Sequence, residues 1–262
     1  MNIIAVDIGN TNITIGLFVN DKQESIATIP GDSTEKLIEV LQSAWNKIPI
    51  LKAAKDKKRD GVLVGSSVKS SWTSKVRQLI KQHLGEKIYM IGEDIPLPME
   101  VAVDEPERVG VDRVVSAAAA YAVVEDAVVV ADFGTAVTID LVDEKGVFLG
   151  GVIMPGFEIS AQVLKDNTAQ LPEVKVHKPD NPYGTNTSDA INCGLYYSAI
   201  GAMEFIVRQY AEKIGKWPQT VIAGGNAELI KDDCKFIDGC VPDLVVKGIV
   251  LAYKKYLEDQ QA

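Results

Sequence analysis

Short apolar runs that end at polar, glycine-containing turns open the chain. Ile3–Val6 leads to Asp7, and after Gly-Asn-Thr-Asn a second apolar run covers Ile13–Val19. Two such runs joined by Gly and Asn predict a β-hairpin. The same plan returns about halfway along the chain, where Val128–Ala131 leads to Asp132 and Phe-Gly-Thr precedes another strand-like run. This repetition indicates a duplicated domain.

The rest of the first half alternates between strand-like and helix-like segments. We expect strands at Glu24–Ile29, Gly61–Gly65 and Lys87–Ile91, and helices at the periodic apolar positions 37–45 and at Val68–Leu84. Asp32 and Glu35 resemble a capping box before the first helix. The predicted order is therefore three strands, a helix, a strand, a helix and a strand.

The second half follows a similar order. We expect strands at Val128–Asp132, Ala136–Val142, Val147–Met154 and Thr220–Ala223, a helix from Gly156, a long helix from Ser188 to about Lys213, and two final helices. Alternating strands and helices in both halves predict an α/β protein. We place the domain boundary near residue 118, which gives domains 1–118 and 119–262.

Composition narrows the classes of function. The chain has 262 residues, 47% of them hydrophobic, and a formal net charge of −9, so it can bury ordinary domain cores but lacks the positive charge of a nonspecific nucleic-acid binder. The N-terminus has no basic leader, and the longest largely apolar stretch, Val114–Val124, is too short to span a bilayer. We expect a cytoplasmic protein with neither nucleic-acid nor membrane partners. The three cysteines and two histidines show no ligand spacing that predicts a metal site.

The segment Asp7–Asn12, D-I-G-N-T-N, combines an acid at a strand end with a glycine turn and hydroxyl and amide side chains. Glycine lets backbone N–H groups approach phosphate oxygens, Thr and Asn donate further hydrogen bonds, and the Asp7 carboxylate can hold Mg²⁺ directly or through water. An ordinary Asn-Gly hairpin turn is the structural alternative.

The second copy, D-F-G-T at Asp132–Thr135, makes a phosphate clamp the better interpretation of the pair. Neither copy is a Walker loop or a dinucleotide fingerprint. A third segment, A-G-G-N-A at Ala223–Ala227, follows a strand and would let a nucleotide approach a helix N-terminus, although a plain left-handed turn fits it as well.

These three segments, in this order, resemble the acetate and sugar kinase, heat-shock ATPase and actin superfamily. The similarity is greatest to type III pantothenate kinases, through D-I-G-N-T, G-V-D-R at Gly110–Arg113 and D-F-G-T-A-V-T at Asp132–Thr138. The segments Gly150–Gly156, Asn186 with Thr187, and Pro242–Gly248 extend the resemblance over nearly the whole chain. It implies two duplicated actin-like (ribonuclease-H-like) domains, each with a mixed five-stranded sheet flanked by helices, and a nucleotide cleft between them.

The resemblance also implies an activity, the ATP-dependent phosphorylation of the primary hydroxyl of pantothenate at the entry to coenzyme A biosynthesis. ATP phosphates would be held by Asp7, Gly9, Asn10, Thr11, Asn12 and Thr14, with Thr135 as a further nucleotide contact. Asp132 would hold a monovalent cation, K⁺ or NH₄⁺. Gly110, Val111, Asp112 and Arg113 would bind pantothenate, with Asp112 as the catalytic base and Thr187 as a further substrate contact.

One position departs from the family pattern. The family usually has a tyrosine seven residues before the glycine of G-x-D-R, and Val103 stands there in this chain. The lost aromatic ring and hydroxyl keep a second kinase reading open, with another hydroxylated small acid as the acceptor. A nucleotide-binding regulator of the same fold is the alternative from a different class, but it would have less need of a base beside an acceptor pocket.

Two further expectations have structural alternatives. Gly194, Ser198, Gly201, Ala202 and Phe205 share roughly one face of the long helix, which would suit a homodimer or equally close packing within one subunit; the family resemblance favours the homodimer. Asp112 could act as the base, or only as a favourable partner of a helix dipole.

Overall fold

The computed structural model describes residues 1–51 and 58–261. They form two compact units, and each consists of segments that are not contiguous in sequence. The first contains Met1–Glu100, Glu105–Ala119 and Val245–Ala262, and the second contains Val101–Asp104 and Ala120–Leu244. Besides the short excursion of Val101–Asp104, the chain passes from the first unit to the second within one helix and returns at its last helix.

The first unit contains a mixed five-stranded sheet. Its strands are β1 (Ile3–Ile8), β2 (Asn12–Val19), β3 (Lys22–Pro30), β4 (Val62–Ser67) and β5 (Ile88–Met90), in the order β3-β2-β1-β4-β5. The first three strands are antiparallel neighbours, whereas β4 and β5 run parallel to β1. The carboxyl ends of β1 and β4 therefore lie at the same edge of the sheet.

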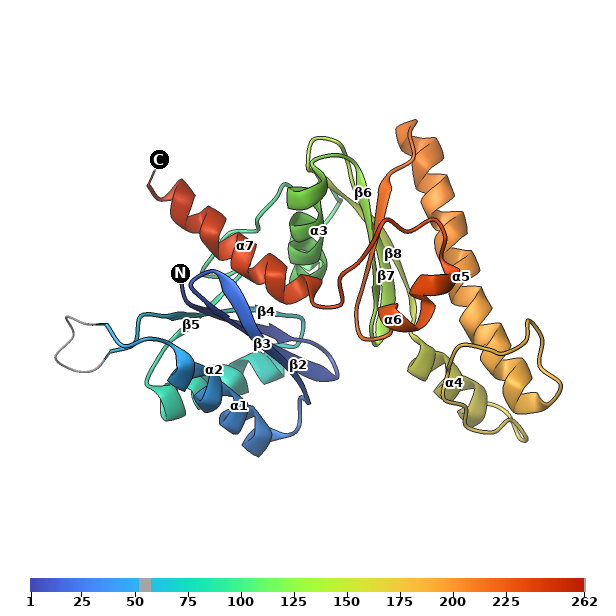
Figure 1. Ribbon diagram of the computed structural model, residues 1–262, viewed down its shortest axis with the longest axis horizontal. Coiled ribbons are helices and arrows are strands. Elements are labelled where there is room, and N and C mark those ends of the chain that lie inside the picture. The colour runs from blue at the N-terminus through green and yellow to red at the C-terminus, as the bar shows by residue number, and fades with distance from the viewer. Residues whose placement is uncertain (52–57, 262) are drawn as a thin grey trace. The chain divides into compact units, whose positions relative to one another are not determined.

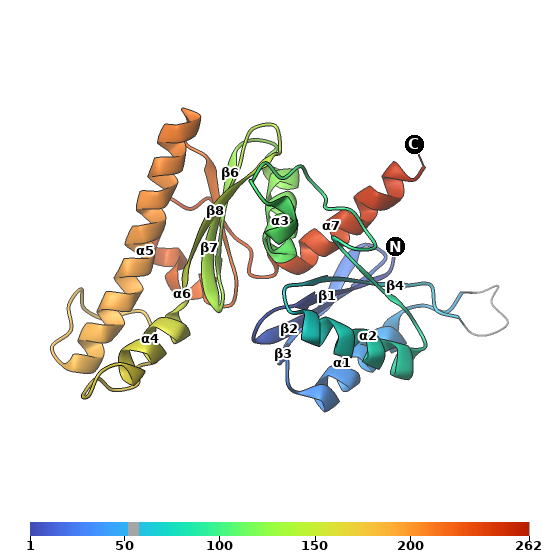
Figure 2. The ribbon, with the colours of Figure 1, turned by 180° about the vertical axis from the view of Figure 1, so that it is seen from behind.

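Helices cover both faces of this sheet (Figures 1 and 2). On one face, α1 (Thr34–Lys47) and α2 (Ser70–Leu84) share an apolar cluster with Ile4 and Val6. On the other face, α7 (Leu244–Asp259) shares a cluster with Ile3 and Ala5. Side chains of a strand alternate between faces, so the continuous apolar run of β1 supplies both clusters.

The second unit repeats the architecture. Its strands are β6 (Val128–Phe133), β7 (Ala136–Val142), β8 (Phe148–Pro155), β9 (Gln219–Ala223) and β10 (Gly239–Cys240), in the order β10-β9-β6-β7-β8. The helices α4 (Phe157–Asp166), α5 (Thr187–Ile214) and α6 (Ala227–Ile230) contribute to one apolar cluster with this sheet. The short 3₁₀ turn Lys231–Asp233 also belongs to this unit, whereas the 3₁₀ turn Pro106–Arg108 lies in the first unit. Helix α3 (Val111–Val124) begins in the first unit and ends in the second.

The predicted fold class is confirmed, since both units have a mixed five-stranded sheet flanked by helices. A single boundary after residue 118 differs from the observed units at α7, which it would assign to the second domain. Burial explains the difference: Val246, Ile249 and Val250 of α7 pack with the apolar face of β1.

The predicted capping box of α1 is wrong. Ser33 occupies the N-cap position, and no side-chain hydrogen bond caps the helix. The backbone N–H of Thr34 instead donates to the carbonyl oxygen of Asp32 at 2.9 Å. A capping box pairs the N-cap residue with the residue three positions later. Because the N-cap is Ser33, Asp32 and Glu35 both lie one residue before these positions.

Helix α5 is long and apolar enough to cross a membrane by length and composition alone. Its Tyr196, Ile200, Met203 and Val207 nevertheless belong to the core cluster of the second unit. A helix that helps form the core of a globular unit meets the same criterion, so this feature is weak evidence for a membrane span.

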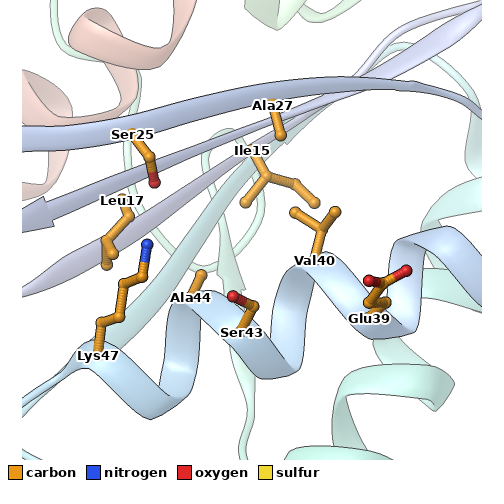
Figure 3. A pocket seen from close by; sticks show the side chains of 9 residues that line it. All are labelled: Ile15, Leu17, Ser25, Ala27, Glu39, Val40, Ser43, Ala44 and Lys47. Carbon is orange, nitrogen blue, oxygen red and sulfur yellow. The ribbon is translucent and has the colours of Figure 1, made fainter.

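A small pocket of about 210 Å³ lies between α1 and the strands β2 and β3 (Figure 3). Ala27 and Ala44 are small residues on its two sides, while Glu39 and Lys47 bring charges to it. None of the predicted site residues lines this pocket.

Candidate active site

The first predicted site residue, Asp7, lies near the carboxyl end of β1. It pairs with Thr14 on β2 and with Ser66 on β4. The fully buried Ser66 donates its hydroxyl hydrogen bond to Asp7 Oδ1 at 2.7 Å. This bond fixes the orientation of a carboxylate at the sheet edge.

The turn after Asp7 is compact and polar. The N–H of Gly9 donates to the carbonyl oxygen of Asn12 at 3.0 Å, and the N–H of Gly31 donates to that of Thr11, also at 3.0 Å. The side chains of Asn10, Thr11 and Asn12 are exposed. The sequence therefore folds into a turn that presents polar groups to solvent, as phosphate binding requires.

The G-V-D-R segment begins α3 at the same edge of the first sheet. A Cβ on Gly110 would lie 2.5 Å from Asp112 Oδ1 and 3.5 Å from Val68 Cγ1, so only glycine fits there without displacement. The N–H of Val68 donates to the carbonyl oxygen of Ile8 at 3.1 Å. These contacts link the Asp112 carboxylate, through Gly110 and Val68, to the end of β1.

The surroundings of Asp112 suit a general base. Burial raises the pKa of its carboxyl above the ordinary value of 3.8, and this outweighs the opposing effect of the Arg113 N–H, which donates to Oδ1 at 2.8 Å. The neighbouring Arg113 charge also opposes the rise in pKa. A carboxylate with a raised pKa accepts a proton more readily than an exposed one.

In the second unit, Asp132 lies near the carboxyl end of β6, beside the Gly-Gly turn. Gly224 has a φ of +89°, and a Cβ on it would lie 2.6 Å from Asp132 Oδ1 and 2.7 Å from the Phe133 backbone. The N–H of Asn226 donates to the carbonyl oxygen of Phe133 at 3.0 Å. The structure thus brings A-G-G-N-A and D-F-G-T together, although the two segments are far apart in the sequence.

The exposed Thr135 lies at the tip of the β6–β7 hairpin, against the start of α4. The N–H of Gly156 donates to its carbonyl oxygen at 3.1 Å, and a Cβ on Gly156 would lie 2.5 Å from that oxygen. Glu158, in the first turn of α4, accepts from the Asn226 amide at 3.4 Å. Hairpin, Gly-Gly turn and α4 therefore form one connected polar surface.

Thr187 and Val103 lie elsewhere in the second unit. Thr187 is the exposed first residue of α5, after Asn186, whose side-chain oxygen accepts from the Asp189 N–H at 2.9 Å. Among the described residues, these hydrogen bonds do not connect Thr187 to the β6–β7 hairpin. Val103 Cγ1 lies 3.4 Å from the position of a Cβ on Gly150 in β8.

Comparison with known proteins identifies the family. A family model described as type III pantothenate kinase matches residues 3–209. The chain belongs to this family. Relatives named type III pantothenate kinase include a protein of Agathobacter rectalis, 35% identical over 97% of this chain and 97% of its own length. A relative of the same name from Dehalococcoides mccartyi is 32% identical, over 96% of this chain and 97% of its own length.

Solved structures support the fold of this type III pantothenate kinase family member. A Baf family protein from Campylobacter jejuni, described as a transcriptional activator, aligns with a TM-score of 0.59 at 18% identity, over 99% of this chain and 100% of its own. Component A of (R)-2-hydroxyglutaryl-CoA dehydratase from Acidaminococcus fermentans aligns with a TM-score of 0.52 at 12% identity, over the full length of both chains. At these identities the likeness shows the actin-like fold alone.

Membership of a kinase family means that the protein uses ATP, typically with a divalent cation. Asp7, with the hydroxyl of Ser66 beside it, offers the hard oxygen donors that Mg²⁺ prefers. No group of three or more His, Cys, Asp or Glu side chains that could hold a metal occurs among residues 1–51 and 58–261.

Sequence reasoning missed three side chains next to the predicted site. Ser66 holds Asp7, Lys69 reaches the turn after β1, and Glu158 holds Asn226. The polar pair Ser66 and Ser67 at the end of an apolar strand was the available signal for the first. Lys69 and Glu158 gave no local signal, because their partners lie 59 and 68 residues away.

Proposed function

We propose that this protein transfers the γ-phosphoryl group of ATP to the primary hydroxyl of pantothenate and forms 4'-phosphopantothenate, the first step of coenzyme A biosynthesis. The observation that carries the proposal is the placement of Asp112. A partly buried carboxylate with a raised pKa is linked, through Gly110 and Val68, to the sheet edge that holds the D-I-G-N-T-N turn. A kinase needs an acceptor-side base beside a phosphate-binding turn.

The proposed roles follow the chemistry of each group. ATP phosphates are held by Asp7, Gly9, Asn10, Thr11, Asn12 and Thr14, with Thr135 as a further nucleotide contact, and pantothenate is held by Gly110, Val111, Asp112, Arg113 and Thr187. Among these groups, the Thr14 hydroxyl on β2 also contacts the Thr28 hydroxyl on β3, at 3.1 Å. Asp7 holds Mg²⁺, directly or through water, and Asp132 holds K⁺ or NH₄⁺. These cations supply positive charge that offsets the charge of the phosphates.

The reaction step is an in-line displacement. Asp112 accepts the hydroxyl proton of pantothenate as the hydroxyl oxygen forms a bond to the γ-phosphorus. The bond between that phosphorus and the bridging oxygen breaks, and ADP leaves with its electron pair. Since the transition state of phosphoryl transfer is loose, positioning of the two substrates carries much of the catalysis and proton transfer comes late.

We also propose a cytoplasmic homodimer that uses the exposed face of α5. Phe205 is 58% exposed, and a Cβ on Gly194 or Gly201 would meet nothing within 4 Å. Close packing within the subunit therefore does not explain the small residues on this face. A second copy of the helix would bury them and Phe205.

A phosphoryl-transfer assay with a panel of hydroxylated acids tests the function. We expect ADP release and a phosphorylated product with pantothenate, at a kcat/KM well above that for the other acids. Preference for a different acid would contradict the proposed acceptor and support the reading that Val103 permits. ATP binding without transfer to any acid would instead support a nucleotide-binding regulator.

A further inference from the structure

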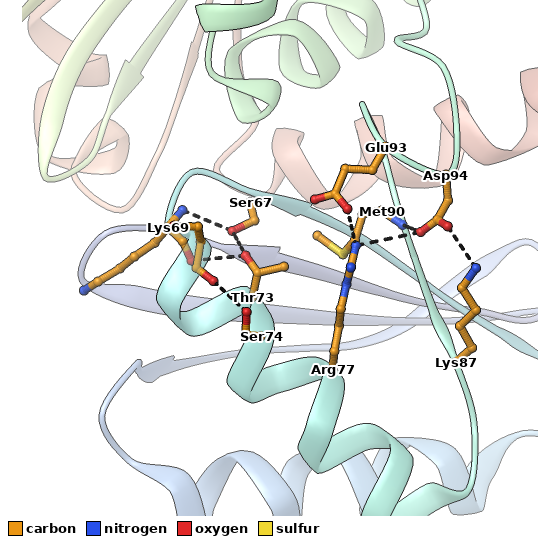
Figure 4. A network of polar contacts seen from close by, with 10 residues as sticks. Ser67, Lys69, Thr73, Ser74, Arg77, Lys87, Met90, Glu93 and Asp94 are labelled. Atoms are coloured by element: carbon orange, nitrogen blue, oxygen red, sulfur yellow. Dashed lines mark hydrogen bonds and ion pairs between the residues drawn. The ribbon is translucent and has the colours of Figure 1, made fainter.

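The segment that joins β4 to α2 has a hydrogen-bond network of its own (Figure 4). The hydroxyl of Ser67 accepts from the backbone N–H of Lys69 at 3.1 Å and from the hydroxyl of Thr73 at 2.6 Å. The carbonyl oxygen of Lys69 lies 3.1 Å from the same Thr73 hydroxyl and shares its single hydrogen as a second acceptor. The backbone of Lys69 is therefore anchored at the point where α2 begins.

The side chain of Lys69 extends from this anchor to the turn after β1. Its Nζ donates to the carbonyl oxygen of Asn10 at 2.8 Å and lies 3.3 Å from the centroid of the Trp72 ring. An ammonium over a tryptophan face is attracted by the ring quadrupole, and part of its hydration shell is replaced. Both contacts hold the positive charge beside the D-I-G-N-T-N turn.

Trp72 reaches the same turn by a second route. Its ring atoms lie 1.6 Å and 1.9 Å from the position that a Cβ on Gly31 would take, so the ring occupies the space that glycine leaves. Gly31 in turn donates its N–H to the carbonyl oxygen of Thr11. Lys69, the N-cap residue of α2, and Trp72, in the first turn of this helix, thus support two consecutive residues of the turn after β1.

The ammonium group of Lys69 has more hydrogen-bond donors than its contact with the turn uses. A lysine ammonium has three N–H donors, and within the described parts of the chain its Nζ donates to one acceptor, the carbonyl oxygen of Asn10. The protein carries a net charge of −9, and Asp7 adds negative charge near the turn. A polyanion bound there needs positive charge close by.

We propose that Lys69 is a phosphate-binding residue, which donates to a phosphate of the nucleotide held by the turn while Asn10 and the Trp72 ring set its position. The inference rests on the proposed function only in taking this turn as the nucleotide phosphate site. The ligand class is a nucleoside di- or triphosphate, because adenosine alone carries no negative charge for the ammonium to pair with.

Calorimetric titration of ATP, ADP and adenosine into the parent and its variants tests the inference. We expect Lys69→Met to weaken ATP and ADP binding about 10- to 100-fold, the usual effect of losing a hydrogen bond to a charged group. Adenosine affinity and the KM for the acceptor should stay within about twofold, and Lys69→Arg should recover most of the ATP affinity. Lys75→Met, on the exposed side of α2, is the charge-matched control and should behave as the parent.

Two results would overturn the inference. ATP binding by Lys69→Met within twofold of the parent would show that the ammonium does not contact phosphate. Equal losses for ATP and adenosine would show that Lys69 acts only by fastening the turn. A parent that fails to bind ATP more tightly than adenosine would refute the proposed function itself, which separates that failure from the failure of Lys69 alone.

Discussion

Individual residues at the two strand ends are restricted by what lies beside them. Gly110 faces the carboxylate of Asp112, and Gly224 faces that of Asp132. In each case a glycine permits an acid to approach the backbone at a distance that any side chain would prevent. These glycines position the carboxylates on which the proposed chemistry depends.

Replacing Asp112 by Asn tests the assignment of the base. We expect kcat to fall by about 10²–10⁴-fold, towards the lower end because the acceptor proton moves late, with little change in ATP binding. Steady-state kinetics and ATP titration measure the two effects. A folded variant with turnover within a few-fold of the parent would leave Asp112 with only a favourable helix-dipole role.

The pH dependence of the parent gives a second test of Asp112. Because burial raises the pKa of this carboxyl, the deprotonated, active form is lost as the pH falls through a value above the ordinary 3.8. We expect the acid limb of kcat/KM to lie above that value and to be absent from the residual activity of Asp112→Asn. An acid limb shared by parent and variant would assign the titration to another group.

Gly224→Ala should disturb Asp132, with Gly225→Ala as the matched control. A Cβ at position 224 would clash with Asp132, and the φ of +89° there is strained for any residue with a side chain. A Cβ at position 225 would meet nothing within 4 Å. We expect Gly224→Ala to lower stability by more than about 1 kcal/mol and to raise the K⁺ concentration for half-maximal activity several-fold. Thermal unfolding and K⁺ titration measure these effects. Equal behaviour of the two variants would contradict the proposed role of the turn.

At the scale of elements, helix α5 combines a buried and an exposed apolar face. Tyr196, Ile200 and Met203 pack in the core, while Tyr197 and Phe205 remain 40% and 58% exposed. The buried face is explained by the fold of the second unit. In the proposed homodimer, a second copy of α5 would cover the exposed face.

Phe205→Glu should convert the proposed dimer to a monomer, because a charge at the centre of a helix–helix contact is costly to bury. Light scattering at micromolar concentration would show the mass fall by half. Val123→Glu is the control, since Val123 is 85% exposed on α3, and should keep the parent's mass. A monomeric parent, or a dimeric Phe205→Glu variant, would contradict the role of α5.

At the scale of the whole molecule, negative charge has to be offset before ATP binds. The chain carries a net charge of −9, and each unit has an aspartate near the end of its first strand, Asp7 and Asp132. Bound cations relieve repulsion between such carboxylates and the phosphates. The need for offsetting positive charge therefore concerns all the phosphates of the nucleotide together.

We therefore expect activity to need both Mg²⁺ and a monovalent cation. Chelation of Mg²⁺ should abolish turnover, and replacement of K⁺ by a bulky organic cation at equal ionic strength should lower it at least about tenfold. Initial rates in matched buffers measure both effects. Equal rates in K⁺ and in the organic cation would contradict the monovalent-cation half of this prediction.

Much of the local structure follows from the sequence alone. The expected strand at Val128–Asp132 is β6 (Val128–Phe133), the expected strand Ala136–Val142 coincides with β7, and the long helix predicted from Ser188 to about Lys213 is α5, Thr187–Ile214. Hydrophobic period and turn residues are properties of neighbours in the chain, so they can be recognised without the fold. The motifs at Asp7 and Asp132 likewise predicted the family, which the comparisons confirm.

Only the tertiary structure decided which distant segments meet. It assigned α7 to the first unit, set Gly224 against Asp132 and brought Lys69 to Asn10. Such pairings join segments far apart in sequence, and they form where the total burial of apolar surface and the satisfaction of backbone groups are most favourable. That balance depends on the whole chain at once, whereas a strand or helix pattern depends on a few adjacent residues.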